Sequence, residues 1–484
     1  MKKIIAVSAF ASLLLAACRP DHPHPKEQQI HIKFTDIEGV PIKESSSGQT
    51  VVITSTQFAN LNPNGLSPDR AKLFVENIQV PFEVAGPNAI SLQLPVMYLH
   101  DYKRIEFTIR YNQSIIRFIE RLLYRPTVTG AVLAGNDGTF QMPAEMTIDA
   151  SGNLYVIDQR TDHDVIIKVT PAGVSSIFAG AANEFGRLVG IGIDLTTLRI
   201  YVADATAQQV KGFNLSSPST VFVKAGSGTA GNADGAGTVA SFRFGTARVD
   251  NFGTNERGQG LHVDALGNIF VGEQFGTAFS GGESQIRKIS PAGLVSTVAG
   301  SRITMPSGPE VLHPVAGVTL HPATGEVAYI GGASSFFQGI ARITTTGTMV
   351  RIAGKVSNEN LVDGPGSIAE FAFPKAISYN EGYYHVADGT NGAYRRVTPA
   401  GNVITLAGVG HFSTPSFCGC GITGPRDSSY VMPSIFTTGA DRYALAAKAI
   451  IMDQVGGIAV KNNGLLYVSD YGTNFKCIWR IRIE

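Results

Sequence analysis

Short apolar runs recur along the chain from residue 126 onward, and six of them end in the same dipeptide, Ala-Gly. Between these dipeptides the chain repeats one order of segments: an apolar strand, a turn containing Gly, a strand ending in an acidic residue, another strand and turn, and the run into Ala-Gly. Four strands recurring every 40–50 residues or so are typical of a propeller blade. The dipeptides are Ala134-Gly135, Ala179-Gly180, Ala225-Gly226, Ala299-Gly300, Ala353-Gly354 and Ala407-Gly408.

The predicted second strands can be counted in the same way. They lie at residues 154–158, 200–204, 269–273, 327–331, 384–388 and 466–470, and five of the six end in an acidic residue: Asp158, Asp204, Glu273, Asp388 and Asp470. Tight turns follow many of the third strands, as in 170–173, 290–293 and 398–401, where Pro-Ala-Gly recurs. Pro presets φ for a turn and Gly accepts a positive φ. The count predicts an all-β propeller of six blades.

The two ends of this region complement each other. Residues 128–135 form a strand with no earlier strands of its own, and the sixth repeat stops after three strands, at residues 478–483. Pairing these two segments would complete the sixth blade and remove both open edges. We therefore expect the strand near Val132 to lie beside the Trp479 segment.

The repeats resemble NHL repeats, and residues 226–244 and 354–374 resemble the long linker of that family. The resemblance implies a six-bladed NHL-type β-propeller over residues 127–484, closed by the N-terminal strand 127–135.

Residues 29–126 lack the repeat but contain runs that alternate apolar and polar residues, such as 50–54 and 105–109. Period-two alternation predicts half-buried strands of a sandwich. Residues 48–58, followed by 72–75 and 94–95, resemble an IPT/TIG domain, which is immunoglobulin-like. The resemblance implies a spacer or interaction module.

The chain begins with Lys2 and Lys3, an apolar stretch at 4–15, and Cys18 after two alanines. This pattern predicts an export signal that is too short to span a membrane. It resembles a bacterial lipoprotein signal, which implies that residues 1–17 are removed, that Cys18 carries lipid, and that the polar residues 18–28 form a tether. The whole arrangement resembles surface lipoproteins of Bacteroidota, many of which capture carbohydrate or other nutrients. That resemblance implies an outer-membrane, cell-surface location.

The balance of charge bears on which classes of partner the protein is expected to bind. The chain has 39 Lys and Arg residues against 38 Asp and Glu residues, a formal net charge of +1. A balanced charge gives no reason to expect nucleic acid as a partner. The expected partners are the membrane, through the lipid anchor, and a glycan or an outer-membrane protein.

Irregular segments fall on one predicted face. In a four-stranded antiparallel blade, the loops between the second and third strands lie on the same face as the linkers between blades. The irregular segments predicted on that face are residues 251–259, 274–284, 331–338 and 409–450. Length variation on one face usually marks the binding face. Aromatic and amide side chains there suit sugar rings, or they hold their own loops in place. The candidates are Phe275, Phe279, Phe336, Phe337, Gln338, Phe412 and Tyr430.

The recurring acidic residues allow two interpretations. They can accept backbone N–H bonds and fix the turn after the second strand. Alternatively, they could line the channel and hold Ca²⁺ or Zn²⁺, which would make the protein a metal-dependent hydrolase or lyase. No two histidines have a metal-ligand spacing and no nucleophile motif is present, so no catalytic residue or cofactor is predicted. A binding module is the first hypothesis, and a structural component of an outer-membrane complex is a third. A disulfide between Cys418 or Cys420 and Cys477 is also expected, because an exported protein permits one.

Overall fold

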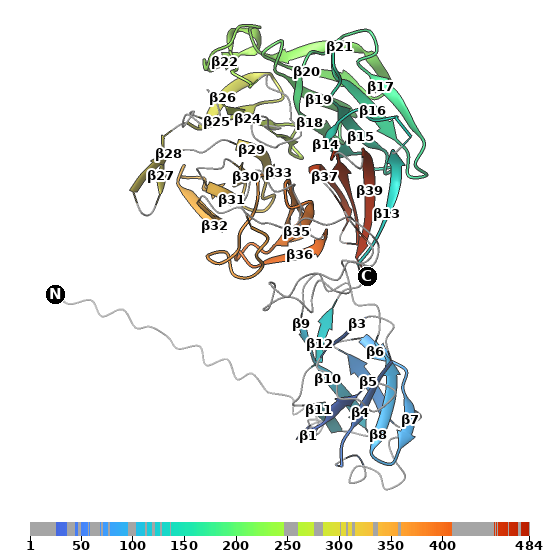
Figure 1. The fold of residues 1–484 in the computed structure, drawn as a ribbon. Helices are drawn as coiled ribbons and strands as arrows, with labels where there is room; N and C mark the ends of the chain where they lie inside the picture. Colours follow the sequence, from blue (N-terminus) through green and yellow to red (C-terminus); the bar gives the residue numbers. More distant parts are fainter. Residues whose placement is uncertain are drawn as a thin grey trace, which may run out of the picture. The chain divides into compact units, whose positions relative to one another are not determined.

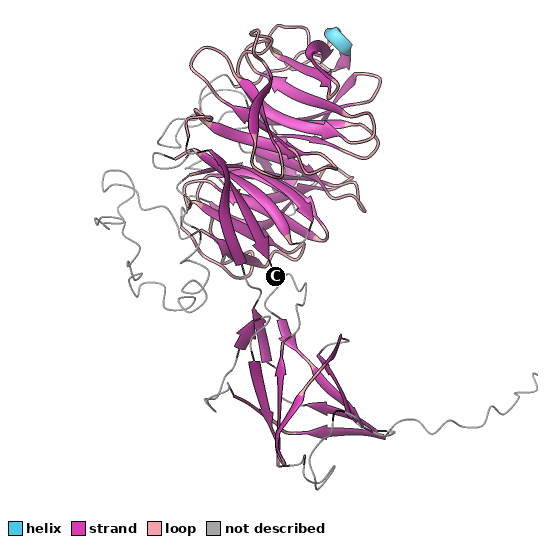
Figure 2. Ribbon diagram, turned by 90° about the vertical axis from the view of Figure 1, so that its right-hand side faces the viewer, coloured by secondary structure: helices cyan, strands magenta, loops and turns pink. Residues whose placement is uncertain are grey.

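The computed structural model divides the chain into two units, Met1–Pro126 and Thr127–Glu484. The structure describes residues 26–35, 44–46, 50–56, 58, 68, 71–75, 78–94, 103–111, 114–118 and 122–125 of the first unit, and 128–135, 137–245, 260–274, 284–300, 302–305, 308–311, 315–332, 337–356, 360–408, 450, 452, 454–462, 464–472 and 476–483 of the second. Strands dominate the regular structure, beside one short 3₁₀ turn, η1 (Gly237–Val239) (Figure 2). Within these ranges, no helix is long and apolar enough to cross a membrane.

The first unit is a β-sandwich. One sheet has the strand order β1-β11-β10-β5-β6 and the other β2-β4-β8-β7, while β3, β12 and β9 form a small third sheet. The strands are β1 (Lys26–Ile30), β2 (Lys33–Thr35), β3 (Glu44–Ser46), β4 (Thr50–Thr54), β5 (Ala71–Val75), β6 (Ile78–Val80), β7 (Glu83–Gly86), β8 (Ala89–Gln93), β9 (Lys103–Ile105), β10 (Phe107–Tyr111), β11 (Ser114–Phe118) and β12 (Leu122–Arg125).

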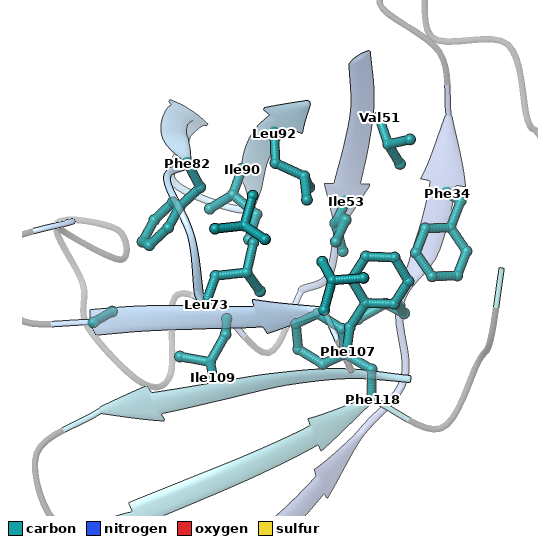
Figure 3. Packing of buried hydrophobic residues seen from close by; sticks show 14 of the residues in the cluster. Phe34, Val51, Ile53, Leu73, Phe82, Ile90, Leu92, Phe107, Ile109 and Phe118 are labelled. Atoms are coloured by element: carbon teal, nitrogen blue, oxygen red, sulfur yellow. The ribbon is translucent and has the colours of Figure 1, made fainter. Parts of the chain in front are cut away.

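Alternation along the strands builds the core of this unit. In β4, Val51 and Ile53 point inward and are buried, and in β10 Phe107 and Ile109 do the same. Side chains from the two larger sheets meet in one cluster (Figure 3). A strand with one buried face needs this period of two, because successive side chains point to opposite faces.

The second unit contains six larger antiparallel sheets within its described residues. Sheet 1 is β14 (Pro143–Ile148), β15 (Leu154–Asp158), β16 (Val165–Val169) and β17 (Ser175–Ala179); sheet 2 is β18 (Leu188–Asp194), β19 (Arg199–Asp204), β20 (Gln209–Asn214) and β21 (Ser217–Ala225). Sheet 3 is β23 (Leu261–Val263), β24 (Ile269–Gln274), β25 (Ser284–Ile289) and β26 (Leu294–Ala299), with β22 (Gly235–Ala236) at its edge. Sheet 4 is β29 (Val315–Leu320), β30 (Val327–Gly332), β31 (Phe337–Ile343) and β32 (Met349–Val356), and sheet 5 is β33 (Pro374–Asn380), β34 (Tyr383–Asp388), β35 (Ala393–Val397) and β36 (Val403–Ala407).

Sheet 6 joins the two ends of the unit. It contains β37 (Val455–Asn462), β38 (Leu465–Asp470), β39 (Cys477–Ile483) and β13 (Val128–Gly135). β13 pairs antiparallel with β39, and Val132 lies opposite Trp479. This is the pairing that the sequence predicted for the two ends. A separate hairpin, β27 (Arg302–Met305) with β28 (Gly308–Val311), lies between sheets 3 and 4 and was not anticipated.

The first strands of the six sheets contact one another in a closed order: β14, β18, β23, β29, β33, β37 and back to β14. In Figure 1 these strands lie toward the centre of the unit, and the last strands, such as β17, β21 and β32, lie at its periphery. Sheets arranged around one axis in this way form a β-propeller.

The recurring Ala-Gly dipeptide lies at the same structural position in each sheet. The alanine lies at an irregularity in the pairing of the last two strands and is buried in all six sheets. Five of the six glycines have a positive φ. At Gly354, a Cβ would lie 2.2 Å from the carbonyl oxygen of Gln338. The outer strand therefore crosses its neighbour so closely that only glycine fits.

Gly354→Ala should destabilise the protein by roughly 2–4 kcal/mol, because it adds backbone strain of about 1 kcal/mol to a clash with strand β31. Gly347 is the matched control: its φ is +80° and a Cβ there meets nothing within 4 Å. Gly347→Ala should show the strain alone. Urea denaturation would measure both variants, and equal losses would contradict the steric explanation.

Candidate functional site

The acidic residues that end the second strands hold the linker entering their own sheet. Each carboxylate is fully buried and accepts a hydrogen bond from the backbone of the linker that precedes the first strand. The donors are the amides of Gln141 and Met142 to Asp158, Gly186 to Asp204, Arg243 to Glu273, Ala372 to Asp388 and Gln454 to Asp470. The sequence analysis placed these bonds at the turn after the second strand, and Asp204 and Asp470 also accept backbone hydrogen bonds there.

None of the five acids belongs to the lining of the cavity on the propeller axis, so that cavity gives no support to a role as channel metal ligands. Their carboxylates point to the linkers instead. A fully buried carboxylate needs such donors, since a charge left without partners in the interior is costly.

Buried glutamines hold the same linkers from the preceding sheet. Gln208 of sheet 2 accepts a hydrogen bond from the Phe244 amide at 2.8 Å and donates one to the Phe244 carbonyl at 3.0 Å. Gln338 of sheet 4 accepts one from the Phe373 amide at 2.6 Å. Linkers between sheets are therefore held from both sides. Sequence reasoning missed this role because glutamine carries no positional signature.

Two predicted ligand-binding residues belong to the core instead. Phe337 is fully buried and packs with Tyr329 and Met349, and Gln338 is fully buried as described above. A surface ligand cannot reach either side chain. Their assignment to β31 explains the error: they were expected in a loop, but they begin the third strand of sheet 4.

Several other predictions fall outside the described residues. These are Cys18, Phe275, Phe279, Phe336, Phe412, Tyr430, Cys418 and Cys420. The connection that holds Phe275 and Phe279 joins β24 to β25, so it runs between the second and third strands of sheet 3, as expected.

Cys477 is a free, buried thiol in the structure, and both of its expected disulfide partners lie outside the described residues. Its side chain packs in an apolar cluster with Leu406 and Ile450. Burial and the nearby Asp470 raise the pKa of the thiol. Since the thiolate is the species that forms disulfides, this position disfavours the reaction.

Two long linkers are locked by buried arginines. Arg395 of sheet 5 pairs with Asp388 at 2.7 Å and with Asp363 of the preceding linker at 3.0 Å, and it donates to the carbonyl of Val362. Thr405 binds the same Asp363 carboxylate.

Sheet 3 has the same arrangement. Its buried Arg287 forms ion pairs with Glu273 of the same sheet and with Asp234 of the preceding linker. Burial raises the pKa of Glu273 to about 7, against the lowering effect of the Arg287 charge. Sequence reasoning missed these arginine partners, although an Asp-Gly linker and a strand Arg occur together in these two repeats.

The channel is closed by a ring of six apolar side chains. Each sheet contributes the first-strand residue that pairs with the second strand two positions before the recurring acidic residue or, in sheet 4, two positions before Gly331. All six are buried. The ring is Met146, Ile191, Leu261, Val318, Ile377 and Ile458.

The residue before each ring member forms a second layer, which we call the collar. Its members are Glu145, Gly190, Gly260, Gly317, Ala376 and Gly457. Glycine is required where backbones touch: a Cβ on Gly260 would lie 2.6 Å from the Gly317 Cα, and one on Gly457 would lie 2.8 Å from the Glu145 Cα. The first strands thus approach until little space remains on the axis.

Ring and collar enclose a cavity of about 40 Å³. That volume admits a few water molecules, whereas sites for drug-sized ligands measure about 300–1,000 Å³. Glu145 is the one charged residue in its lining. The side chain is 9% exposed, and burial raises its pKa to about 8, against a hydrogen bond with the Ile191 backbone.

The described residues contain no group of three His, Cys, Asp or Glu side chains that could hold a metal. The histidines His262, His321 and His385 belong to three different sheets. His385 is buried and its Nδ1 lies 2.7 Å from the Tyr394 hydroxyl, a structural contact between neighbouring strands.

Comparison with known structures supports the fold. A protein of unknown function from Bacteroides thetaiotaomicron aligns with a TM-score of 0.51 and 11% identity over 94% of this chain and 98% of that one. An auxiliary nutrient binding protein from the same species aligns at 0.49 with 12% identity over 94% and 98%. A gluconolactonase from Xanthomonas campestris aligns at 0.44 with 10% identity over 74% and 90%. The first likeness shows a shared fold.

No protein-family model matches the sequence, and no curated protein matches it. The NHL and IPT/TIG resemblances therefore remain interpretations of its motifs.

Arg395→Met should destabilise the protein by about 3–5 kcal/mol, because it leaves the buried Asp388 carboxylate without its cation. Lys461→Met, at an exposed position of β37, should change the free energy of unfolding by no more than about 0.5 kcal/mol. Denaturant titration would compare the two. A loss below about 1 kcal/mol for Arg395→Met would show that the lock contributes little.

Proposed function

We propose that this protein is a lipid-anchored binding module of the bacterial cell surface. In this proposal Cys18 carries the anchor, an IPT/TIG-like sandwich acts as a spacer, and a six-bladed NHL-type propeller binds a glycan or a protein partner. The binding surface is the face that carries the linkers and the loops between second and third strands, which we call the linker face.

The main observation that supports this proposal is the small volume of the cavity on the propeller axis. The cavity on the axis holds about 40 Å³, and apolar side chains dominate its lining. A sugar ring or a peptide cannot enter a space of that size, so a ligand must bind on an outer surface. A hydrolase or lyase with a channel metal is less well supported, since within the described residues Glu145 is the one metal-binding type of side chain in this cavity.

On the linker face, the linkers are held in place at their base, which favours ligand binding. Buried side chains of two neighbouring sheets hold its linkers, as Asp388 of sheet 5 and Gln338 of sheet 4 hold the linker between them. Loops that extend from a fixed base lose less conformational entropy when they bind. The opposite face consists mostly of short turns such as 150–153 and 265–268, which repeat one pattern.

The test is a glycan-array experiment with residues 19–484. Phe275→Ala and Phe279→Ala, in the connection between β24 and β25, should each weaken binding about 10- to 100-fold if these rings contact the ligand. Leu266→Ala is the matched control, because Leu266 is 79% exposed in the turn between β23 and β24.

Binding lost in the two phenylalanine variants and kept in Leu266→Ala would support the linker face. Failure of every glycan to bind would leave the protein partner as the remaining form of the proposal. Equal loss in Leu266→Ala would contradict the choice of face.

A further inference from the structure

Glu145 lies where the first sheet meets the last. Its backbone contacts Gly457 of β37, and the Ser469 hydroxyl of β38 donates a hydrogen bond to the adjacent Ala144 carbonyl at 2.7 Å. The Ile191 backbone of sheet 2 forms a hydrogen bond with its carboxyl group. We call the contact between β14 and β37 the seam, since it joins the two ends of the ring.

The identity of this residue is unexpected at this position. Among the six collar residues, four are glycine and one is alanine, because neighbouring backbones need the space. A carboxyl group here is 91% buried (9% exposed) beside apolar ring side chains such as Met146 and Ile458. Ionising it inside the ring is costly, since burial disfavours the charged form and, within the part of the chain that the structure describes, no cation shifts its pKa.

Charged groups on the surrounding strands do not offset this cost. β29 carries none, and Asp194 of β18 and Lys461 of β37 lie toward the opposite ends of their strands. Burial lowers the pKa of His262 on β23 to about 4, so it is neutral near pH 7. Lys375 precedes Ala376 on β33, but its side chain lies beside Gly389, and only burial and the Ile191 backbone shift the pKa of Glu145.

We propose that Glu145 makes closure of the ring respond to pH. While its carboxyl group is neutral, the first and last sheets pack tightly around a cavity with room for only a few water molecules. When the group ionises, it requires hydration, and opening of the seam supplies the water.

The direction of the effect follows from proton linkage. In an open, hydrated seam the pKa of Glu145 would return to its ordinary value near 4.5, against about 8 in the closed ring. Between these values the closed state binds more protons, so closure weakens as the pH rises. The opening equilibrium constant should rise about tenfold per pH unit from roughly pH 5 to pH 8, and it should level off beyond.

Hydrogen exchange tests this with residues 19–484 between pH 5 and pH 9, after correction for intrinsic exchange rates. Protection of amides in β14 and β37 should fall by about 400-fold between pH 5 and pH 8 in the wild type. In Glu145→Gln it should stay constant relative to β29, which lies away from the seam. Glu184→Gln, which changes a carboxylate on the linker into sheet 2, should keep the wild-type slope.

Glu145→Ala provides a second variant if Glu145→Gln does not fold, because the collar already accepts alanine at Ala376. A purely structural role would change seam protection by the same factor at every pH. A wild-type profile parallel to that of β29, or a pH slope that survives in either Glu145 variant, would overturn the proposal.

Discussion

The propeller depends on the hydrogen bonds that hold each linker between two sheets. The linkers between sheets carry backbone groups into the interior, where each unpaired donor would cost about 1–3 kcal/mol. Asp388 takes the Ala372 amide from one side, and Gln338 takes the Phe373 amide from the other. Because both side chains are buried, these bonds hold the linker in a fixed position between consecutive sheets.

This constraint separates the inside of the propeller from its surface. The first strands approach until glycines such as Gly260 and Gly317 touch, and the apolar ring fills the axis. The interior is thus used for stability. In the proposed function, recognition uses the linker face, where loops vary in length above linkers that buried side chains hold in place. Glu145 is the exception, a polar group placed in the most tightly packed layer.

Much of the fold was predictable because its cause is local. A buried alanine followed by a glycine of positive φ ends the outer strands, as at Ala353 and Gly354, so the repeat is visible in the sequence. The strand ending in Asp158 and the sixth repeat that lacks one strand were visible for the same reason. By contrast, Phe337 and Gln338 were placed in a loop, since nothing near them marks where β31 begins.

The sequence by itself determined the repeat, the two units and the pairing of β13 with β39, because spacing, alternation and turn residues act over a few positions. Only the tertiary structure decided what each buried polar side chain does. Arg395 meets Asp363 across 32 positions of the chain, and Glu145 meets Gly457 only after the ring closes. Such partners are brought together by the packing of whole sheets, which leaves no mark in the order of neighbouring residues.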